Sequence, residues 1–240
     1  MEEKTKFLTN TLIAHRGLHN ELIPENSLKA FKEAIKKKHT IEFDVHLLKD
    51  GNVVVFHDDN LQRMTGVNKK IKNTTYDEIK SLRLKDTDEH IPLLSDILKL
   101  VNGQVPLLIE LKYDNKVGKL EEKLMTILKE YKGLYALQSF SPLSLIYLRK
   151  HYPDAIRGLL VAKFKKSHMN ILKKVILRHM FLKPWIKPDF ISCQYEFLTN
   201  KKIQKFHQNK LLLTWTVRTQ EEFNQYKELC DNCIVENIIK

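Results

Sequence analysis

The chain has few cysteines and no long apolar run. Its three cysteines are an odd number, which argues against a disulfide framework. Cys230 and Cys233 form a CxxC pair, but no second pair completes a zinc site, so we expect buried or partly buried free thiols. No apolar stretch approaches the roughly 18 residues of a membrane-spanning helix. The start, Met1-Glu2-Glu3-Lys4, lacks the apolar stretch of a signal peptide, and we therefore expect a cytoplasmic protein.

Acidic residues are missing from one long segment. Residues 155–188 contain nine Lys and Arg and no Asp or Glu, within a chain whose formal net charge is +12. Such a distribution favours anionic partners, which include phosphate substrates, an anionic membrane surface and nucleic acid. Charge alone does not choose among them. Since no RNA- or DNA-binding motif is visible, we expect no nucleic-acid partner.

Apolar, β-branched runs alternate with helical patterns along the whole chain. The runs are continuous, as is typical of parallel strands buried on both faces. They cover residues 11–15, 40–45, 105–111, 134–140, 156–161, 190–195, 211–217 and 233–235. Apolar stripes at helical spacing lie between them, at residues 27–37, 120–131, 142–150 and 221–229, and cap signals predict short helices over 75–82 and 96–101. Eight strands alternating with helices predict an α/β fold, a (β/α)8 TIM barrel, with residues 1–240 as a single domain.

One further apolar run interrupts this alternation. Val53–Phe56 follows the second strand too closely for a parallel crossover, and Asp50-Gly51 between them is a hairpin turn signal. Antiparallel pairing would place His57 roughly opposite Asp44. We therefore predict a β-hairpin excursion after strand 2, followed by a small insertion over about 60–94 at the active-site mouth.

Three carboxylates occupy strand positions that suit a metal ion. Glu42 and Asp44 are two residues apart on one strand and so point to the same face, and Glu110 lies near the end of another strand. Carboxylates this close repel each other unless a cation lies between them. Oxygen ligands of this kind suit Mg²⁺, Ca²⁺ or Mn²⁺ rather than zinc. The alternative is that the acids form buried ion pairs with Arg16 and Lys112; three acids together with two histidines favour the metal site.

Histidines and cations accompany these carboxylates. His15 ends the first strand and His57 ends the hairpin, and imidazole titrates near neutral pH, so we expect acid–base catalysis from the pair. Arg16 and Lys112 are placed to hold a phosphate, Arg through its planar fork and Lys as a point charge.

Two aromatic residues complete the candidate site. Trp215 and Phe140 lie near the ends of predicted strands. Each is a candidate to line the organic part of a substrate, and core packing explains either position equally well.

The order of these motifs carries a family resemblance. His15-Arg16-Gly17 is followed by Pro-Glu-Asn-Ser, Glu-x-Asp, His-Asp, Glu-x-Lys and finally Trp-Thr-Val. This series resembles the glycerophosphodiester phosphodiesterase family over residues 13–237. The resemblance implies a TIM barrel, one divalent cation, and cleavage of glycerophosphodiesters to sn-glycerol 3-phosphate and an alcohol. It gives the metal-ligand positions to Glu42, Asp44 and Glu110, the acid–base positions to His15 and His57, and the phosphate contacts to Arg16 and Lys112.

A few positions depart from the family pattern. His46 stands where Gln is common, Arg218 replaces the Asn that usually follows Trp-Thr-Val, and Glu236 stands where the last strand often ends in Thr-Asp. None of these changes removes an expected metal ligand or imidazole. Arg218 and Glu236 are expected near the barrel mouth, where they would alter the head group accepted.

The basic segment permits a second function. An apolar stripe there, flanked by Lys173, Lys174 and Arg178, comprises Met169, Leu172, Val175, Ile176 and Met180. It could lie on an anionic membrane and present lysophospholipids to the barrel, as in a lysophospholipase D-like enzyme. The alternative, an ordinary outer helix of the barrel, is favoured. A non-catalytic phosphate-binding barrel ranks below either enzyme.

Overall fold

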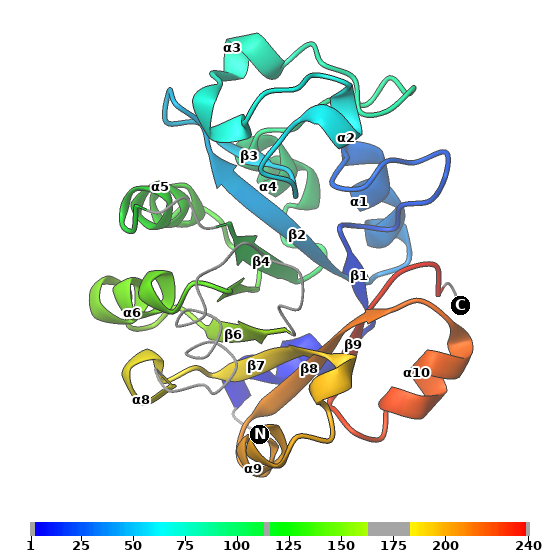
Figure 1. Ribbon diagram of the computed structural model, residues 1–240, viewed down its shortest axis with the longest axis vertical. Helices are drawn as coiled ribbons and strands as arrows, with labels where there is room; N and C mark the ends of the chain where they lie inside the picture. The colour runs from blue at the N-terminus through cyan, green and yellow to red at the C-terminus, as the bar shows by residue number, and fades with distance from the viewer. Residues whose placement is uncertain (1–2, 113–115, 163–182, 239–240) are drawn as a thin grey trace.

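Eight parallel strands close into a barrel in the computed structural model, which describes residues 3–112, 116–162 and 183–238 (Figure 1). The strands follow the order β1, β9, β8, β7, β6, β5, β4, β2, and pairing of β1 with β2 closes the ring. They are β1 (Ile13–His15), β2 (Thr40–Leu47), β4 (Leu107–Leu111), β5 (Tyr135–Ser139), β6 (Arg157–Val161), β7 (Phe190–Gln194), β8 (Leu211–Val217) and β9 (Asn232–Val235). The predicted (β/α)8 barrel is confirmed, and every predicted strand forms within two residues of its expected ends.

The helices are η1 (Glu3–Thr9), α1 (Leu28–Lys36), α2 (Gln62–Thr65), η2 (Ile71–Asn73), α3 (Tyr76–Ile79), α4 (Leu94–Val101), α5 (Lys119–Leu128), α6 (Pro142–His151), α8 (Lys183–Ile186), η3 (Tyr195–Phe197), α9 (Lys201–His207) and α10 (Gln220–Tyr226). Helices of the βα units lie outside the strands, η1 packs against the inside of the barrel, and α2, η2 and α3 belong to the insertion after the hairpin. The Ser27 hydroxyl accepts the backbone N–H of Ala30 and caps α1, at the start of the predicted range.

Four predicted helix boundaries were wrong by two or three residues. Helices α5 and α10 end at Leu128 and Tyr226, three residues before the predicted ends. Helix α4 begins two residues before the predicted 96, because the extended residue Leu93 precedes the helix and buried Leu94 begins it. The capping box of Thr75 and Glu78 forms, but α3 ends at Ile79 rather than continuing through residue 82.

The barrel interior is apolar at the end that lies nearest the amino ends of the strands. Phe7 and Leu8 of η1 pack there against inward-facing residues of the strands, which are Ile13, Leu108, Ala136, Phe190, Leu211, Leu213 and Ile234. Side chains alternate along a strand, so the residue two positions further on faces the interior again, nearer the carboxyl end. On β1, β4 and β5 those next positions hold His15, Glu110 and Gln138. The barrel therefore changes from an apolar floor to a polar mouth within two residues.

A hairpin leaves the barrel after β2, as the Asp50-Gly51 signal predicts. β3 (Val53–Val55) pairs antiparallel with β2, with Val55 opposite Val45. The backbone N–H of Phe56 donates to the carbonyl of Asp44 at 3.0 Å, so His57 follows directly beside the carboxylate strand. The residues after it form a small apolar cluster of their own, which includes Leu61, Met64 and Ile71.

Three further expectations from the sequence concern the cysteines, membrane-spanning helices and the basic segment. Cys193, Cys230 and Cys233 are free and buried, as expected. No helix within residues 3–112, 116–162 and 183–238 combines the length and apolarity needed to cross a membrane. The apolar stripe from Met169 to Met180 lies outside the described residues.

Candidate active site

Three buried carboxylates meet at the barrel mouth. β2 carries Glu42 and Asp44 on its inner face, and β4 carries Glu110 in register with Asp44. The residues are 2%, 1% and 7% exposed, respectively. One oxygen of each lies within 4.8 Å of an oxygen of the others. The three residues predicted as metal ligands thus form one cluster.

Cations lie against two of these carboxylates. The ammonium of Lys112 is 2.7 Å from Asp44 Oδ1 and 2.6 Å from Glu110 Oε1. Although burial opposes ionisation, Lys112 and the other nearby cations hold the pKa of Asp44 well below its usual range. The carboxylates therefore form one cluster and also form buried ion pairs. The two alternatives that the sequence offered, a metal site and buried ion pairs, do not exclude each other.

Glu42 has no ion-paired ammonium or guanidinium among the described residues. Its side chain accepts the amide N–H of Gln138 at 3.3 Å and the backbone N–H of Arg16 at 3.2 Å. Burial raises its pKa well above the ordinary value, and the charges of Asp44 and Glu110 raise it further. A divalent cation among the three would remove that repulsion. The donor set, all carboxylate oxygens, fits Mg²⁺, Ca²⁺ or Mn²⁺.

The His-Arg-Gly turn and the Pro-Glu-Asn-Ser motif position Arg16. Its backbone is left-handed (φ 55°), and its carbonyl accepts the N–H of Asn26 at 3.0 Å. The guanidinium donates to Glu25 at 2.7 Å, and its Nε lies 3.5 Å from Asp44. The amide of Asn26 donates to the same Asp44 carboxylate at 3.0 Å. The two motifs therefore hold a cation beside the carboxylate cluster.

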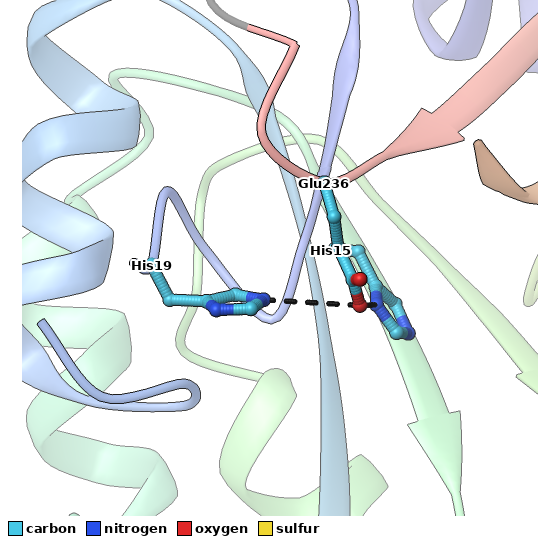
Figure 2. A group of neighbouring side chains, drawn as sticks. All are labelled: His15, His19 and Glu236. Carbon is cyan, nitrogen blue, oxygen red and sulfur yellow. Dashed lines mark hydrogen bonds and ion pairs between the residues drawn. The ribbon is translucent and has the colours of Figure 1, made fainter. Parts of the chain in front are cut away.

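Glu236 fixes the orientation of His15 (Figure 2). Its Oε1 lies 2.5 Å from His15 Nδ1, and His19 Nε2 approaches the same oxygen at 3.8 Å. Arg218 Nε donates to the other oxygen of Glu236 at 2.8 Å. With Nδ1 held in this way, His15 directs Nε2 toward Glu42, 3.9 Å from its Oε2. Burial lowers the pKa of His15 to about 4, despite the opposing hydrogen bond to Glu236.

His57, which follows β3, is held by a similar contact to a carboxylate. Its Nδ1 lies 2.6 Å from Asp58 Oδ1, and the His46 ring contacts its carbonyl at 3.3 Å. Arg63 of α2 binds both Asp58 and Glu25, at 2.6 and 2.7 Å. The insertion after the hairpin thus links the His57 side of the mouth to the motif that positions Arg16.

The two aromatic candidates occupy different places. Phe140 lines a cavity of about 310 Å³ together with His57, Glu110 and Lys112. Trp215 donates its indole N–H to the carbonyl of Ser192 at 3.1 Å and packs edge-on against Phe140, with ring centroids 5.7 Å apart. Phe140 therefore borders the cavity directly, and Trp215 supports it from within the barrel.

Several contributors to this site escaped sequence reasoning. Gln138 and His19 carried no recognised motif, and Arg63 lies in an insertion that has no strand register to place it. Glu236 could have been placed at the site from the sequence, because it lies two residues after the inward-facing Ile234, just past the end of the strand that pairs with β1.

Comparison with known proteins gives one family. A family model described as the glycerophosphoryl diester phosphodiesterase family matches residues 15–239. A glycerophosphodiester phosphodiesterase of Caldanaerobacter subterraneus subsp. tengcongensis is 35% identical over 161 residues, which cover 62% of this chain and 65% of that relative. A lysophospholipase D of Rattus norvegicus is 34% identical over 143 residues, covering 54% of this chain and 44% of its own length. The chain thus spans less than two thirds of either relative.

A solved structure shows the same fold over nearly the whole chain. It is a phosphodiesterase of Oleispira antarctica in complex with the product sn-glycerol-3-phosphate. Its TM-score is 0.80 at 22% identity, covering 97% of this chain and 94% of the other.

Proposed function

The chain belongs to the glycerophosphoryl diester phosphodiesterase family, and we propose that it hydrolyses glycerophosphodiesters to sn-glycerol 3-phosphate and an alcohol, using a divalent cation. The observation that carries the proposal is the buried cluster of Glu42, Asp44 and Glu110, with His15 and His57 at the same barrel mouth. The Caldanaerobacter relative bears the name of this activity, and the Oleispira phosphodiesterase binds the proposed product.

The proposed cation lies among the three carboxylates. When bound, it would polarise a phosphate oxygen and lower the pKa of the glycerol 2-hydroxyl. Asp44 and Glu110 also hold Lys112, and burial opposes the lysine's charge, but these two carboxylates keep its pKa above the ordinary value. The site thus retains a fixed positive charge beside its ligands.

Arg16 and Lys112 offer unused donors for the phosphate. Among the described residues, the buried Nε of Arg16 has no hydrogen-bond partner. Lys112 has three N–H donors and gives its short contacts to two carboxylates, so one donor remains. A phosphate oxygen accepting from both groups would satisfy the orphaned Nε. It would also place the ester bond beside the cavity that Phe140 lines.

The imidazoles supply proton transfer. His15 and His57 each have Nδ1 held by a carboxylate, which leaves Nε2 to exchange a proton with the substrate. One imidazole takes the proton of the attacking glycerol 2-hydroxyl, and the other gives a proton to the leaving alcohol. This step leaves a cyclic phosphate, which water then opens to sn-glycerol 3-phosphate; direct attack by water on the diester would use the same two imidazoles. Both imidazole rings lie at the barrel mouth, so the proposed proton transfers need no movement of either ring.

The test is release of sn-glycerol 3-phosphate from glycerophosphocholine, with and without Mg²⁺, Ca²⁺ or Mn²⁺. We expect activity with at least one ion, abolition by EDTA, and a loss of roughly a hundredfold or more in His15→Ala and His57→Ala. The control is His90→Ala, an exposed histidine of the insertion. Activity that persists in EDTA removes the metal from the scheme, and near-normal rates in either histidine variant remove that residue.

Lysophospholipids are the second candidate substrate, because the Rattus relative is named as a lysophospholipase D. The same chemistry would release choline from lysophosphatidylcholine, with the acyl chain outside the mouth. Running this substrate beside glycerophosphocholine decides between them by the ratio of kcat/KM values. A non-catalytic phosphate-binding barrel is left only if neither substrate is cleaved.

A further inference from the structure

A second, larger cavity adjoins the one that Phe140 lines. It has a volume of about 630 Å³ and lies between the β2–β3 hairpin turn, η2 and the start of α5. Lys112 and Asp59 line both cavities, so the two spaces meet beside the proposed phosphate position. The larger cavity therefore neighbours the catalytic one, on the side that carries His57.

Lysines dominate the wall of this cavity. Seven lysines and four carboxylates line it, a formal excess of three positive charges. The lysines come from separate elements: Lys49 from the hairpin turn, Lys70 from the insertion, and Lys119 and Lys123 from α5. The side chain of Lys123 extends toward the turn, since its Cε lies 3.8 Å from the place of a Cβ on Gly51.

Three of the four carboxylates in the wall, all except Asp59, already accept hydrogen bonds from other groups. Asp50 accepts the backbone N–H of Tyr76 at 2.7 Å, and Glu122 accepts the Tyr147 hydroxyl. Glu121 accepts the N–H of Gly118 at 2.7 Å and so caps α5. Within the described part of the chain, Lys49, Lys70, Lys119 and Lys123 form no ion pair with a carboxylate. Their charges converge on open space.

We propose that this lysine-lined cavity binds a second phosphate carried by the alcohol portion of the substrate. The inference rests on the proposed function, and it specifies the substrate class as glycerophosphodiesters whose head group bears a phosphate monoester. A head group that extends past His57 reaches Asp59 and then the lysines. The volume suits a polar head group, since ligand pockets commonly measure about 300–1,000 Å³.

Charge determines the expected preference. A phosphate monoester carries about −1.5 to −2 charges at pH 7. Two or three contacts with exposed lysines should together favour the phosphorylated substrate by about tenfold. Because these lysines are exposed, the preference should fall as salt rises.

The test compares glycerophosphoinositol with glycerophosphoinositol 4-phosphate, which differ by one phosphate monoester. We measure kcat/KM for sn-glycerol 3-phosphate release at low salt and at 0.5 M NaCl. Wild type should favour the phosphorylated substrate by about tenfold at low salt. The double variant Lys119→Glu/Lys123→Glu should lose the preference and keep its rate on glycerophosphoinositol. Glutamate at these exposed positions in the first turns of α5 is compatible with the helix.

The matched control is Lys32→Glu/Lys205→Glu, which makes the same change in net charge on α1 and α9. This variant should retain the preference. Equal loss in both double variants, or no preference in wild type, overturns the cavity proposal and leaves the phosphodiesterase proposal intact. Failure of wild type to cleave either substrate counts instead against the proposed function.

Discussion

Position along a strand decides which single residues carry chemistry in this barrel. Ile13 and Ile234 face the apolar floor, and the residues two positions later, His15 and Glu236, meet at the mouth. Since β1 and β9 are neighbours, the pairing brings together side chains that are 221 residues apart in sequence. The carboxylate is thus placed by strand alternation rather than by any local motif.

The first residue-scale prediction concerns Glu236. Its two oxygens accept from different donors, His15 on one and Arg218 on the other. Gln at this position has one oxygen, so one donor would face an amide N–H, and His15 would lose its fixed tautomer. Glu236→Gln should lower kcat by about 10- to 100-fold with little change in KM. Steady-state kinetics on glycerophosphocholine measures both values.

Glu236→Asp is the matching control, because it keeps both oxygens and the charge. It should retain more activity than the Gln variant, and its thermal unfolding should be close to that of wild type. If Gln and Asp lose activity equally, or if only KM rises, Glu236 does not position His15.

The second residue-scale prediction concerns stability in acid. Burial works against ionisation of Glu25, but hydrogen bonds from Arg63 and Arg16 lower its pKa to about 2. An unfolded Glu titrates near 4.3, so the stabilisation is complete above that pH and is lost as pH falls toward 2. Glu25→Gln should cost about 1–3 kcal/mol at pH 7, and the difference from wild type should shrink below pH 4.5.

Urea unfolding of both proteins at pH 7, 5 and 4 measures this difference. The exposed Glu130→Gln serves as the control and should change little. A difference that is constant across these pH values would mean that Glu25 stabilises the fold by packing rather than by charge.

Among the structural elements, the turn after β1 strongly restricts which residue can occupy position 17. Gly17 is left-handed (φ +79°), and a Cβ there would lie 2.7 Å from Phe31 Cδ1 and 2.9 Å from the backbone of Ala30. The turn therefore packs directly on α1, and the fit sets the position of Arg16.

Gly17→Ala tests this packing. It should destabilise the protein by about 2–4 kcal/mol, through positive φ and overpacking together, and should raise KM by displacing Arg16. Gly66→Ala is the control, because Gly66 has a similar φ of +77° with nothing within 4 Å of its Cβ position. It should cost about 1 kcal/mol and leave KM unchanged. Equal unfolding free energies for the two variants would rule out the contact with α1.

Elements with strong periodicity were predictable from sequence, and contacts between elements were less so. The apolar runs gave all eight barrel strands, and Asp50-Gly51 gave the hairpin, because buried parallel strands and tight turns restrict residue types locally. Glu42, Asp44 and Glu110 followed from strand parity. The bond from Arg63 to Glu25 was not predictable, since it depends on how the insertion packs beside the Pro-Glu-Asn-Ser motif.

At the scale of the whole molecule, charge is arranged around the three carboxylates at the barrel mouth. Burial and mutual repulsion raise the pKa of Glu42, while Lys112 and Arg16 stabilise the charge on its neighbour Asp44. The fold therefore holds Glu42 at the barrel mouth, where its ionised form is unfavourable. This arrangement is costly for stability alone and supports the divalent cation proposed among the three carboxylates.

The last prediction follows from that cost. A cation that binds the folded protein stabilises it, by about 2.7 kcal/mol at a hundred times Kd, so Mg²⁺, Ca²⁺ or Mn²⁺ should raise Tm and EDTA should lower it. Glu42→Gln removes the repelling charge and keeps the side-chain shape. It should raise Tm in EDTA relative to wild type and abolish the response to the ion.

The exposed Glu130→Gln should leave the ion response intact. Scanning calorimetry in EDTA and in each ion measures both effects. A Glu42→Gln protein that is less stable in EDTA and still responds to the ion would mean that the carboxylate serves the fold and does not bind the cation.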